Sequence, residues 1–305
     1  MIKTIEGLYR ATRMFPYLNQ LIFVFPFYAI LVVNGLVDSV YSLLLVLPFM
    51  GIMAAGGIYN TICDAPFDPK YKNPITRGDI SKKTTMIWML ISIIISIILF
   101  ILFYKSYVAF IIFLFYILLW LAYSGFKIRF KESVLGPFIA SFIGYLAAPF
   151  ILLVEFNYFN YPSSFLLLGL YIIYLAHEIK HTIVDYDEDQ INNCKTFAVL
   201  IGRKYSCLLE YLLLITGFAL ILGSSYLLGN SFIFNIIFVI LFMISIISTV
   251  SYGLKNNFNI NEVLFNALPY VLTKVFIIIF ACLIFDLPAL LILFIIWISL
   301  LDKYL

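Results

Sequence analysis

Residues 84–103 read TTMIWMLISIIISIILFILF, a stretch with no charged side chain. A helix needs roughly 20 mostly apolar residues to cross the hydrocarbon core of a bilayer, so this stretch predicts a transmembrane helix. Apolar stretches of comparable length predict further crossings at 17–34, 40–63, 107–123, 134–154, 164–184, 205–228, 231–252 and 264–285. The sequence therefore predicts an all-α fold, a polytopic membrane helical bundle of about nine transmembrane helices.

The composition agrees with a membrane protein. Of the 305 residues, 64% are hydrophobic and 11% are charged, and the mean hydropathy is +1.07. A soluble domain carries about 25% charged residues, so an ordinary water-soluble globule is excluded. No linker interrupts the apolar stretches, and we expect one integral-membrane domain, 1–305. The stretch 287–301 is short for a span: a tenth crossing, a broken half-helix and an interfacial segment all fit it.

The charge and cysteine content exclude two further classes. A formal net charge of +3 is too small to indicate binding to nucleic acid. The four cysteines lie far apart, without the close spacing of a zinc site. We therefore expect contacts with membrane lipids and no nucleic-acid partner.

Lysine and arginine divide unequally between the two ends of the predicted helices. When connections are assigned to alternate sides, the side of the N-terminus receives fifteen of them: Lys3, Arg10, Arg13, Lys70, Lys72, Arg77, Lys82, Lys83, Lys127, Arg129, Lys131, Lys195, Arg203, Lys204 and Lys255. The opposite side receives Lys105 and, with nine spans, Lys303. Because cytoplasmic loops are enriched in Lys and Arg, we expect a cell-membrane protein whose N-terminus and polar loops are cytoplasmic.

Acidic residues cluster after the second and sixth predicted spans. The first cluster, GGIYNTICDAPFDPKYKNPITRGDIS at 56–81, places Asn60, Asp64 and Asp68 at intervals of four. The second cluster contains Asp185 and Asp189 at the same interval. Residues four apart share one face of a helix, so each D-x-x-x-D pair would present two carboxylates in one direction. Pro66 weakens this argument for the first pair, because proline disfavours a continuous helix.

Four predicted spans separate the two clusters, so both emerge on the same side of the membrane. Converging carboxylates need a cation, and Mg²⁺ suits them because it takes oxygen ligands and usually retains substrate phosphates. Basic residues in the same connections would hold phosphate oxygens: Lys72, Arg77, Lys127, Arg129, Lys131 and Lys195. The alternative is that the acids are solvated loop charges.

These residues resemble motifs of the UbiA superfamily of intramembrane prenyltransferases. The family's N-x-x-x-D-x-x-x-D is matched from Asn60 to Asp68, and its D-x-x-x-D from Asp185 to Asp189. A third motif, Y-x-x-x-K, is matched by Tyr123-Ser-Gly-Phe-Lys127, and a basic run follows at Arg129 and Lys131. One departure is Asn73, which stands where many members have arginine. Lys72 or Arg77 must then supply that charge, or the donor is gripped differently.

The resemblance implies a helical bundle around a central cavity. It also implies Mg²⁺-dependent transfer of a polyprenyl group from a polyprenyl diphosphate donor to a lipid-soluble acceptor. That acceptor is an aromatic or quinone precursor, or a glycerol-phosphate lipid. Catalytic and metal-binding roles then fall on Asp64, Asp68, Asp185 and Asp189, with Asn60 orienting the diphosphate or a metal-bound water. The substrate-binding candidates are Tyr123, Lys127, Arg129, Lys131, Lys72 and Arg77.

Two ionisable residues near the end of the sixth predicted span are further candidates. Glu178 and His181 are three apart, and ionisable side chains at membrane depth are usually functional. They would line the acceptor cavity, with one acting as a base. A structural role within the span is an equally open alternative.

Three other activities remain as alternatives. Within the same enzyme class, the pattern also fits a UbiA-type terpene cyclase or a phosphoribosyl-type transferase. From a different class, an ion-coupled transporter would also use charges inside spans. Transporters more often place such charges at broken helices near the bilayer midplane. The gathering of acids and bases at one membrane face favours phosphate chemistry.

Overall fold

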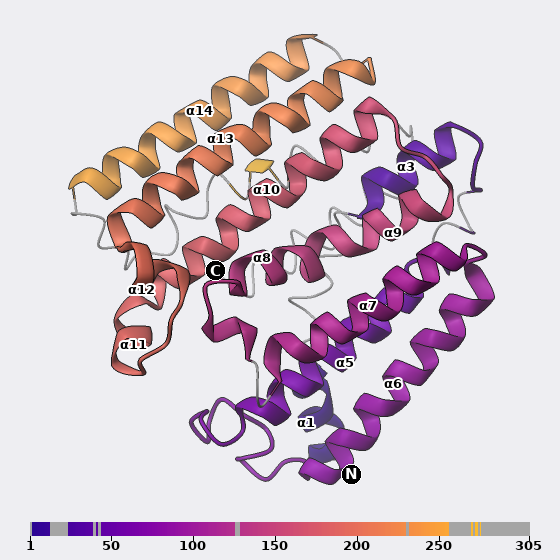
Figure 1. Cartoon of the computed structure of the whole chain (residues 1–305), viewed down its shortest axis with the longest axis vertical. Helices are drawn as coiled ribbons and strands as arrows, with labels where there is room; N and C mark the ends of the chain where they lie inside the picture. The colour runs from indigo at the N-terminus through magenta and orange to yellow at the C-terminus, as the bar shows by residue number, and fades with distance from the viewer. Residues whose placement is uncertain are drawn as a thin grey trace.

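The computed structural model describes residues 2–12, 24–38, 41, 44–125, 129–229, 232–255, 270, 272–273 and 275. All regular structure within these ranges is helical (Figure 1). The predicted all-α class is therefore confirmed.

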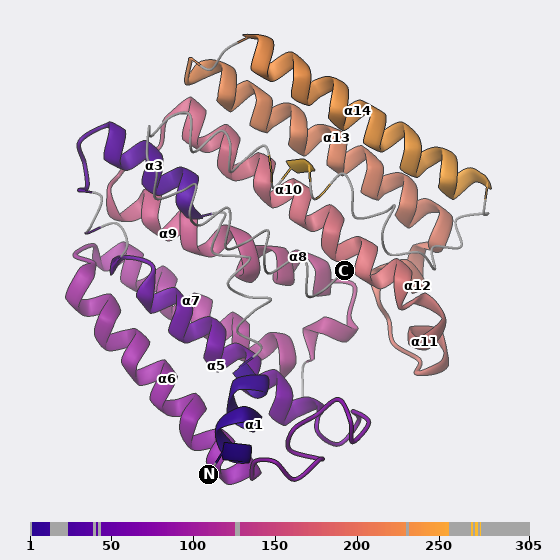
Figure 2. The same ribbon diagram turned by 180° about the vertical axis from the view of Figure 1, so that it is seen from behind.

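The first group of helices is built on α5 (Leu47–Asp64). It packs against both α6 (Lys82–Phe103) and α7 (Tyr107–Ser124), as both faces of the molecule show (Figures 1 and 2). The short α1 (Ile2–Thr12) lies against α5 at the end where α6 begins. This group supplies the connections that follow α5 and α7.

One apolar segment, Gly136–Glu155, runs through the middle of the molecule in three parts. It comprises α8 (Gly136–Ser141), a π-helical turn η3 (Phe142–Leu146) and α9 (Ala147–Glu155), and α9 contacts α3 (Phe25–Val33). Pro149 explains the irregular turn, because it has no N–H to donate four residues back and its ring crowds that carbonyl group. A wider turn before the proline relieves the mismatch.

The second group consists of long antiparallel helices with two short ones between them. α10 (Tyr161–Val184) leads through α11 (Tyr186–Ile191) and α12 (Phe197–Ile201) into α13 (Arg203–Leu227), and α14 (Phe232–Lys255) follows. α13 lies between α10 and α14 (Figures 1 and 2).

Two glycines bring α10 and α13 into backbone contact. A Cβ atom on Gly169 would lie 2.8 Å from the carbonyl oxygen of Gly217, and a Cβ on Gly217 would lie 2.8 Å from that of Gly169. Neither carbonyl belongs to a flexible side chain, so both positions require the absence of a side chain. Small residues permit this close packing between helices in membranes.

Helix starts follow ordinary capping chemistry. Pro48 occupies the first turn of α5, where a missing N–H costs nothing. Ser81 and Ser106 precede α6 and α7, and each side-chain oxygen accepts a hydrogen bond from a backbone N–H two or three residues into the helix. Asn160 and Ser163 form a reciprocal capping box at the start of α10.

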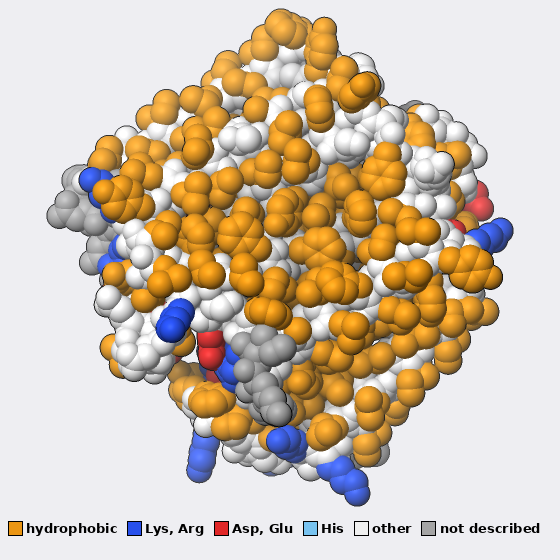
Figure 3. Space-filling view, viewed as in Figure 1, with side chains coloured by type: hydrophobic (Ala, Val, Ile, Leu, Met, Phe, Trp, Pro, Cys, Tyr) orange, Lys and Arg blue, Asp and Glu red, His pale blue; other side chains and the backbone are white. Residues whose placement is uncertain are grey.

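Among the residues that the structure describes, five helical segments are long and apolar enough to cross a membrane: Lys82–Phe103, Tyr107–Ser124, Gly136–Glu155, Tyr161–Val184 and Arg203–Leu227. Their outward faces carry many exposed large hydrophobic side chains, for example Ile98, Ile101 and Leu102 of α6. Figure 3 shows hydrophobic side chains over most of one face, with Lys, Arg, Asp and Glu gathered toward its margins. Such a surface suits contact with lipid rather than water.

These five segments agree closely with the predicted spans 84–103, 107–123, 134–154, 164–184 and 205–228. α14 overlaps the predicted 231–252, and α5 begins at Leu47 rather than at 40. The predicted 17–34 is represented by α3 in its second half. The predicted 264–285 lies almost entirely outside the described residues, as does the whole of 287–301. The count of nine spans and the central cavity therefore stay predictions.

Hydrogen bonds join neighbouring elements at the end of the bundle where α6 ends and α7 begins. The two carboxylate oxygens of Glu155 accept from the backbone N–H groups of Lys105 and Ser106, at 2.8 and 2.9 Å. The hydroxyl of Tyr104 donates to the carbonyl of Leu45 at 2.9 Å. The connections after α5, α7 and α10 lie at the opposite end, which is the lower left in Figure 1.

Candidate active site

The last turn of α5 presents Asn60 and Asp64 in buried positions, with exposed fractions of 9% and 8%. The Oδ1 atom of Asn60 accepts a hydrogen bond from the hydroxyl of Ser124, the last residue of α7, at 2.9 Å. Burying an unpaired carboxylate is costly, so Asp64 requires a nearby cation. The connection after α7 supplies it.

Lys131 and Arg129 reach Asp64 from that connection, which includes the short η2 (Phe130–Glu132). The ammonium group of Lys131 forms an ion pair with Asp64 and donates to Asn60 Oδ1 at 3.2 Å. One guanidinium nitrogen of Arg129, Nη2, lies 3.4 Å from Asp64 Oδ1 and 2.5 Å from Glu132. Both residues were predicted to bind the diphosphate, and the structure places them beside the first acidic motif.

Arg129 has two further features. Its φ of 40° places the backbone in the left-handed region, which costs a non-glycine residue roughly 1 kcal/mol or more. Within the part of the chain that the structure describes, its buried Nε and Nη1 atoms have no hydrogen-bond partner. Buried guanidinium donors are normally satisfied, so these two N–H groups are ready to bind an anion.

Asp68 lies just beyond the end of α5. Its backbone N–H donates to the carbonyl of Asp64 at 2.8 Å, so the chain makes one further turn although the helix has ended before Pro66. The buried amide of Asn73 donates to Asp68 at 3.1 Å and to the carbonyl of Thr61 at 2.9 Å. Asn73, which replaces the family's arginine, thus ties the loop to α5.

Asp185 and Asp189 lie one turn apart where α10 passes into α11. Asp185 ends α10, and its carbonyl accepts from the N–H of Asp189 at 2.8 Å, so the predicted helical spacing is present. The hydroxyl of the buried Thr196 donates to Asp189 at 2.8 Å. Asp187 points elsewhere and pairs with Arg203 at 2.8 Å.

The connection after α7 links the two acidic segments. The backbone N–H of Lys195, six residues after Asp189, donates to the carbonyl of Glu132 at 3.2 Å. Glu132 in turn pairs with Arg129, which contacts Asp64. The two acidic segments therefore emerge at the same end of the bundle, with the basic residues between them.

The electrostatics of the second acidic segment indicate a place for a cation. Partial desolvation and the neighbouring carboxylates of Asp189 and Glu188 raise the pKa of Asp185, although Lys72 opposes the shift. Desolvation and the carboxylates of Glu188 and Glu132 likewise raise the pKa of Asp189, against the hydrogen bond from Thr196. A metal ion bound between these oxygens would relieve the repulsion. The donor set consists of carboxylate and amide oxygens, which fits Mg²⁺.

The remaining predicted substrate-binding residues make fewer described contacts with the acidic motifs than Arg129 and Lys131 do. Lys72 is mostly exposed, and its Nζ lies 3.9 Å from Asp68. Arg77 pairs with Asp79 instead of with the acidic motifs. Tyr123 is half-buried against the hydrophobic core, and Lys127 lies outside the described residues.

Glu178 and His181 lie in the last two turns of α10, before Asp185, together with His177. Sequence reasoning missed His177, Ser124 and Thr196, and it named Asn73 without predicting its contacts. The nearest available signal was their position in the sequence: Ser124 follows Tyr123 of the matched Y-x-x-x-K motif, and Thr196 follows the basic residue Lys195.

The family model for the UbiA prenyltransferase family matches residues 21–268. The chain belongs to this family. Together with the five long apolar helices, membership identifies it as an integral membrane protein. No curated protein sequence matches the chain.

Solved structures of the UbiA family share the fold. A structure from work on digeranylgeranylglyceryl phosphate synthase in membranes aligns with a TM-score of 0.72 and 19% identity, covering 94% of this chain and 100% of that one. A UbiA homologue from Archaeoglobus fulgidus, bound to GPP and Mg²⁺, aligns with a TM-score of 0.62 and 16% identity, covering 92% and 100%. The apo homologue from Aeropyrum pernix K1 gives 0.60 and 16%, covering 84% and 94%.

Proposed function

We propose that this protein transfers a polyprenyl group from a polyprenyl diphosphate to a lipid-soluble acceptor, with Mg²⁺ bound by Asp64, Asp68, Asp185 and Asp189. The observation that carries the proposal is Arg129, whose guanidinium lies at 3.4 Å from Asp64 and keeps two buried N–H groups unpaired within the described structure. A phosphate oxygen is the natural partner for such donors beside a metal-binding carboxylate.

The chemistry requires cleavage of the bond between the allylic carbon and the diphosphate oxygen. Mg²⁺ would neutralise negative charge on the departing diphosphate. Arg129 and Lys131 would bind its remaining oxygens, with Lys72 at the mouth of the site and Lys127 as a further candidate. Asn60 would orient the diphosphate or a metal-bound water. These groups stabilise charge that develops only as the bond breaks, which accelerates the reaction rather than merely tightening binding.

The acceptor supplies the electron pair that forms the new bond, and it must lose a proton. Glu178 and His181 are the proposed acceptor-side residues, since they lie one to two turns from Asp185 on the same helix. Both an aromatic or quinone precursor and a glycerol-phosphate lipid fit this role. The similarity to the digeranylgeranylglyceryl phosphate synthase structure favours the glycerol-phosphate lipid.

We also infer that residues 1–305 form one domain in the cell membrane, with the N-terminus and the acidic connections on the cytoplasmic side. The bias of Lys and Arg supports this orientation. Donor and acceptor would reach the site from the lipid with their hydrophobic tails still in an apolar environment.

The proposal is tested with the purified full-length protein, labelled polyprenyl diphosphates of several chain lengths and both acceptor classes. We expect Mg²⁺-dependent product that EDTA abolishes. Asp64→Asn and Asp185→Asn should each lower the rate about 100-fold or more, the cost typical of removing a group that stabilises developing charge. Asp187→Asn is the matched control: it lies between Asp185 and Asp189 but has an exposed side chain paired with Arg203.

Undiminished transfer by both Asp→Asn variants would remove the acidic motifs from the mechanism. A cyclised hydrocarbon formed without acceptor would indicate a terpene cyclase. A sugar-phosphate acceptor specificity would indicate a phosphoribosyl-type enzyme, and ion flux without product would indicate a transporter.

A further inference from the structure

Near the end of α10, residues 177–181 read His-Glu-Ile-Lys-His, and these two histidines are the only ones in the chain. Histidines four apart share one face of a helix, a spacing by which helices bind zinc. Nothing in the proposed prenyl transfer requires a second histidine, so the function of His177 needs a separate explanation.

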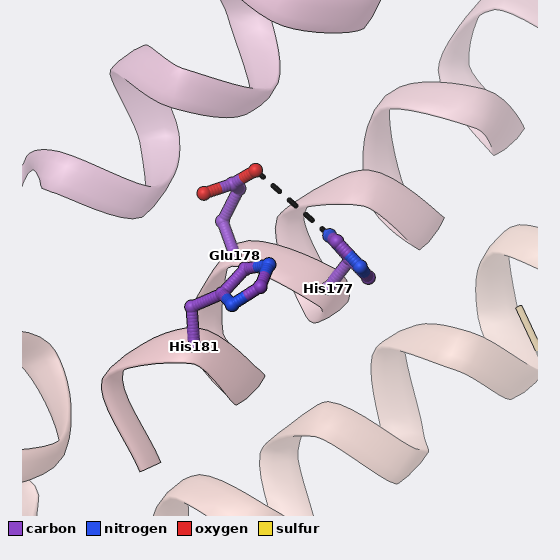
Figure 4. A group of neighbouring side chains, drawn as sticks. All are labelled: His177, Glu178 and His181. Carbon is purple, nitrogen blue, oxygen red and sulfur yellow. Dashed lines mark ion pairs between the residues drawn. The ribbon is translucent and has the colours of Figure 1, made fainter. Parts of the chain in front are cut away.

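The three polar side chains converge. One potential ligand atom from each of His177, Glu178 and His181 lies within 4.8 Å of the others (Figure 4). The Nδ1 atom of His177 is 3.9 Å from Glu178 Oε1, and the two imidazole rings are nearly perpendicular, with centroids 4.5 Å apart. Two ligands of one tetrahedral zinc ion lie about 3.3 Å apart, given metal–ligand distances of about 2.0–2.1 Å. Small rotations of the side chains would bring the three ligand atoms from within 4.8 Å of one another to the shorter separation that a zinc ion requires.

The surroundings favour a bound ion over a fully packed cluster. His181 is exposed, and the side chains of His177 and Glu178 retain 26% and 17% exposure. An ion can therefore approach from the His181 side. Lys180, the nearest cation in sequence, has its Nζ 5.2 Å above the ring of Tyr270, so its ammonium group contacts this aromatic ring.

Aromatic packing holds the ring of His177 in place. Tyr270 contacts it edge-on with a centroid distance of 4.9 Å, and the Tyr270 hydroxyl donates to the buried Glu210 at 2.9 Å. Tyr174 lies on the same ring at 6.2 Å. Groups that fix the orientation of a histidine ring strengthen metal binding because the ring loses less freedom when the ion arrives.

From this geometry we propose that His177, Glu178 and His181 form a binding site for a divalent transition metal, with Zn²⁺ or Co²⁺ as the expected class. Imidazole ligands suit these borderline ions, whereas the all-oxygen donors at Asp64 and Asp185 suit Mg²⁺. Three protein ligands leave one coordination position open, as in metal sites that bind a small ligand or water. The proposed site is separate from the Mg²⁺ site. It shares Glu178 and His181 with the proposed acceptor side, so a bound ion would occupy these side chains, and its test measures metal binding rather than prenyl transfer.

The direct test uses the full-length protein, labelled with ¹⁵N-histidine and purified with a tag that contains no histidine. Because the chain has two histidines, its imidazole nitrogen spectrum contains the resonances of His177 and His181 alone. We expect one equivalent of Zn²⁺ to shift a ring nitrogen of each residue, and Mg²⁺ at millimolar concentration to shift neither. Unchanged resonances in the presence of Zn²⁺ would overturn the proposal in the unmodified protein.

Variants separate this site from the Mg²⁺ site. Isothermal titration should show Zn²⁺ affinity lowered on the order of tenfold or more by His181→Gln and by Glu178→Gln. Thr182→Val is the matched control, since its hydroxyl bonds only within the helix, to the carbonyl of Ile179 at 2.7 Å. Asp185→Asn should retain Zn²⁺ binding whether or not the enzyme is active. Loss of Zn²⁺ binding in Asp185→Asn with retention in His181→Gln would assign the ion to the aspartates and contradict the proposal.

Discussion

Lys131 lies where a metal ion would bind. Its ammonium group pairs with Asp64 and donates to Asn60, two proposed ligands of the metal and diphosphate. Lys131→Met should therefore tighten Mg²⁺ binding in the absence of donor, on the order of tenfold, because the metal no longer displaces a cation. The same change should raise the KM for the donor, since one phosphate contact is lost.

Isothermal titration of Mg²⁺ and steady-state kinetics measure these two effects. Lys83→Met removes the same charge from an exposed position at the start of α6 and should leave both quantities unchanged. Weaker Mg²⁺ binding in Lys131→Met would show that the lysine supports the metal rather than competing with it.

The hydrogen bond from Thr196 to Asp189 should influence how Mg²⁺ binding at the proposed site depends on pH. The pKa values of Asp185 and Asp189 are raised above the ordinary 3.8, and the proposed Mg²⁺ would bind the deprotonated carboxylates. Protons should therefore displace Mg²⁺ at a higher pH than from exposed aspartates. The metal-free fold should show the opposite trend: with raised pKa values it would bind more protons than the unfolded chain just above pH 3.8, and so gain stability as the pH falls through that window.

Thr196→Val removes the hydrogen bond that lowers the pKa of Asp189. The midpoint for loss of Mg²⁺ should then move upward by about one pH unit, because a hydrogen bond to a charged group is worth about 1.5 kcal/mol or more. Titrations of Mg²⁺ at a series of pH values give this midpoint. Thr216→Val is the control, since the exposed Thr216 bonds only to the carbonyl of Leu212. A midpoint that is unchanged in Thr196→Val would exclude Asp189 from the metal site.

The four-residue spacing of the aspartates could predict which acidic residues emerge together, but it could not predict all of their hydrogen-bond partners. Asp185 and Asp189 keep their four-residue interval because α11 continues the helical geometry of α10. From the sequence, Asn73 indicated only that an arginine common in the family is missing. In the structure its amide anchors the loop by donating to Asp68 and to the carbonyl of Thr61. That role depends on how the chain folds back after Pro66 and Pro69, and the residue types alone do not fix that path.

At the scale of helices, the contact between α10 and α13 positions the end of α10. Gly169→Ala should lower stability by about 2 kcal/mol, because its Cβ would lie 2.8 Å from a backbone carbonyl that cannot move without separating the helices. Thermal unfolding in detergent measures the change. Gly223→Ala on α13 is the matched control: its Cβ would meet Phe165 at 3.4 Å, and a gain in helix propensity offsets this contact. Equal effects of the two substitutions would contradict the close-packing argument.

Helix positions were predictable where the hydrophobic signal was long, as for α6 and α13. The start of α5 at Leu47 was harder to predict, because apolar residues continue on both sides of Pro48 and hydropathy does not distinguish an apolar turn from a helix. The π-helical turn at Phe142–Leu146 also left no periodic signal. One inserted turn barely changes the spacing of apolar residues in a segment that is apolar on all sides.

At the scale of the whole molecule, the orientation in the membrane is open to test. In a cysteine-free background, Lys105→Cys should react with an impermeant maleimide in intact cells. Asn192→Cys should react only after the membrane is opened. Both positions are exposed and lie at opposite ends of the bundle. The reverse labelling pattern would contradict the predicted cytoplasmic location of the acidic connections.

The distribution of charge along the sequence predicted which connections share an end, because alternation through the spans is a counting argument. It did not predict that the connection after α7 would contact both acidic segments. That arrangement arises from the packing of α5, α7, α8 and α10, a sum of many small contacts that no local pattern encodes.

The two carboxylate bonds of Glu155 have a mechanical consequence. They hold the start of α7 and the end of α9 through backbone amides, which no ligand at the other end would displace. At the acidic end, ion pairs of Arg129 and Lys131 with Asp64 join the connection after α7 to α5, and an arriving metal ion or phosphate would compete for these side chains. The end of the bundle near Glu155 should therefore keep its arrangement when a charged ligand binds, so that any rearrangement would be confined to the acidic end.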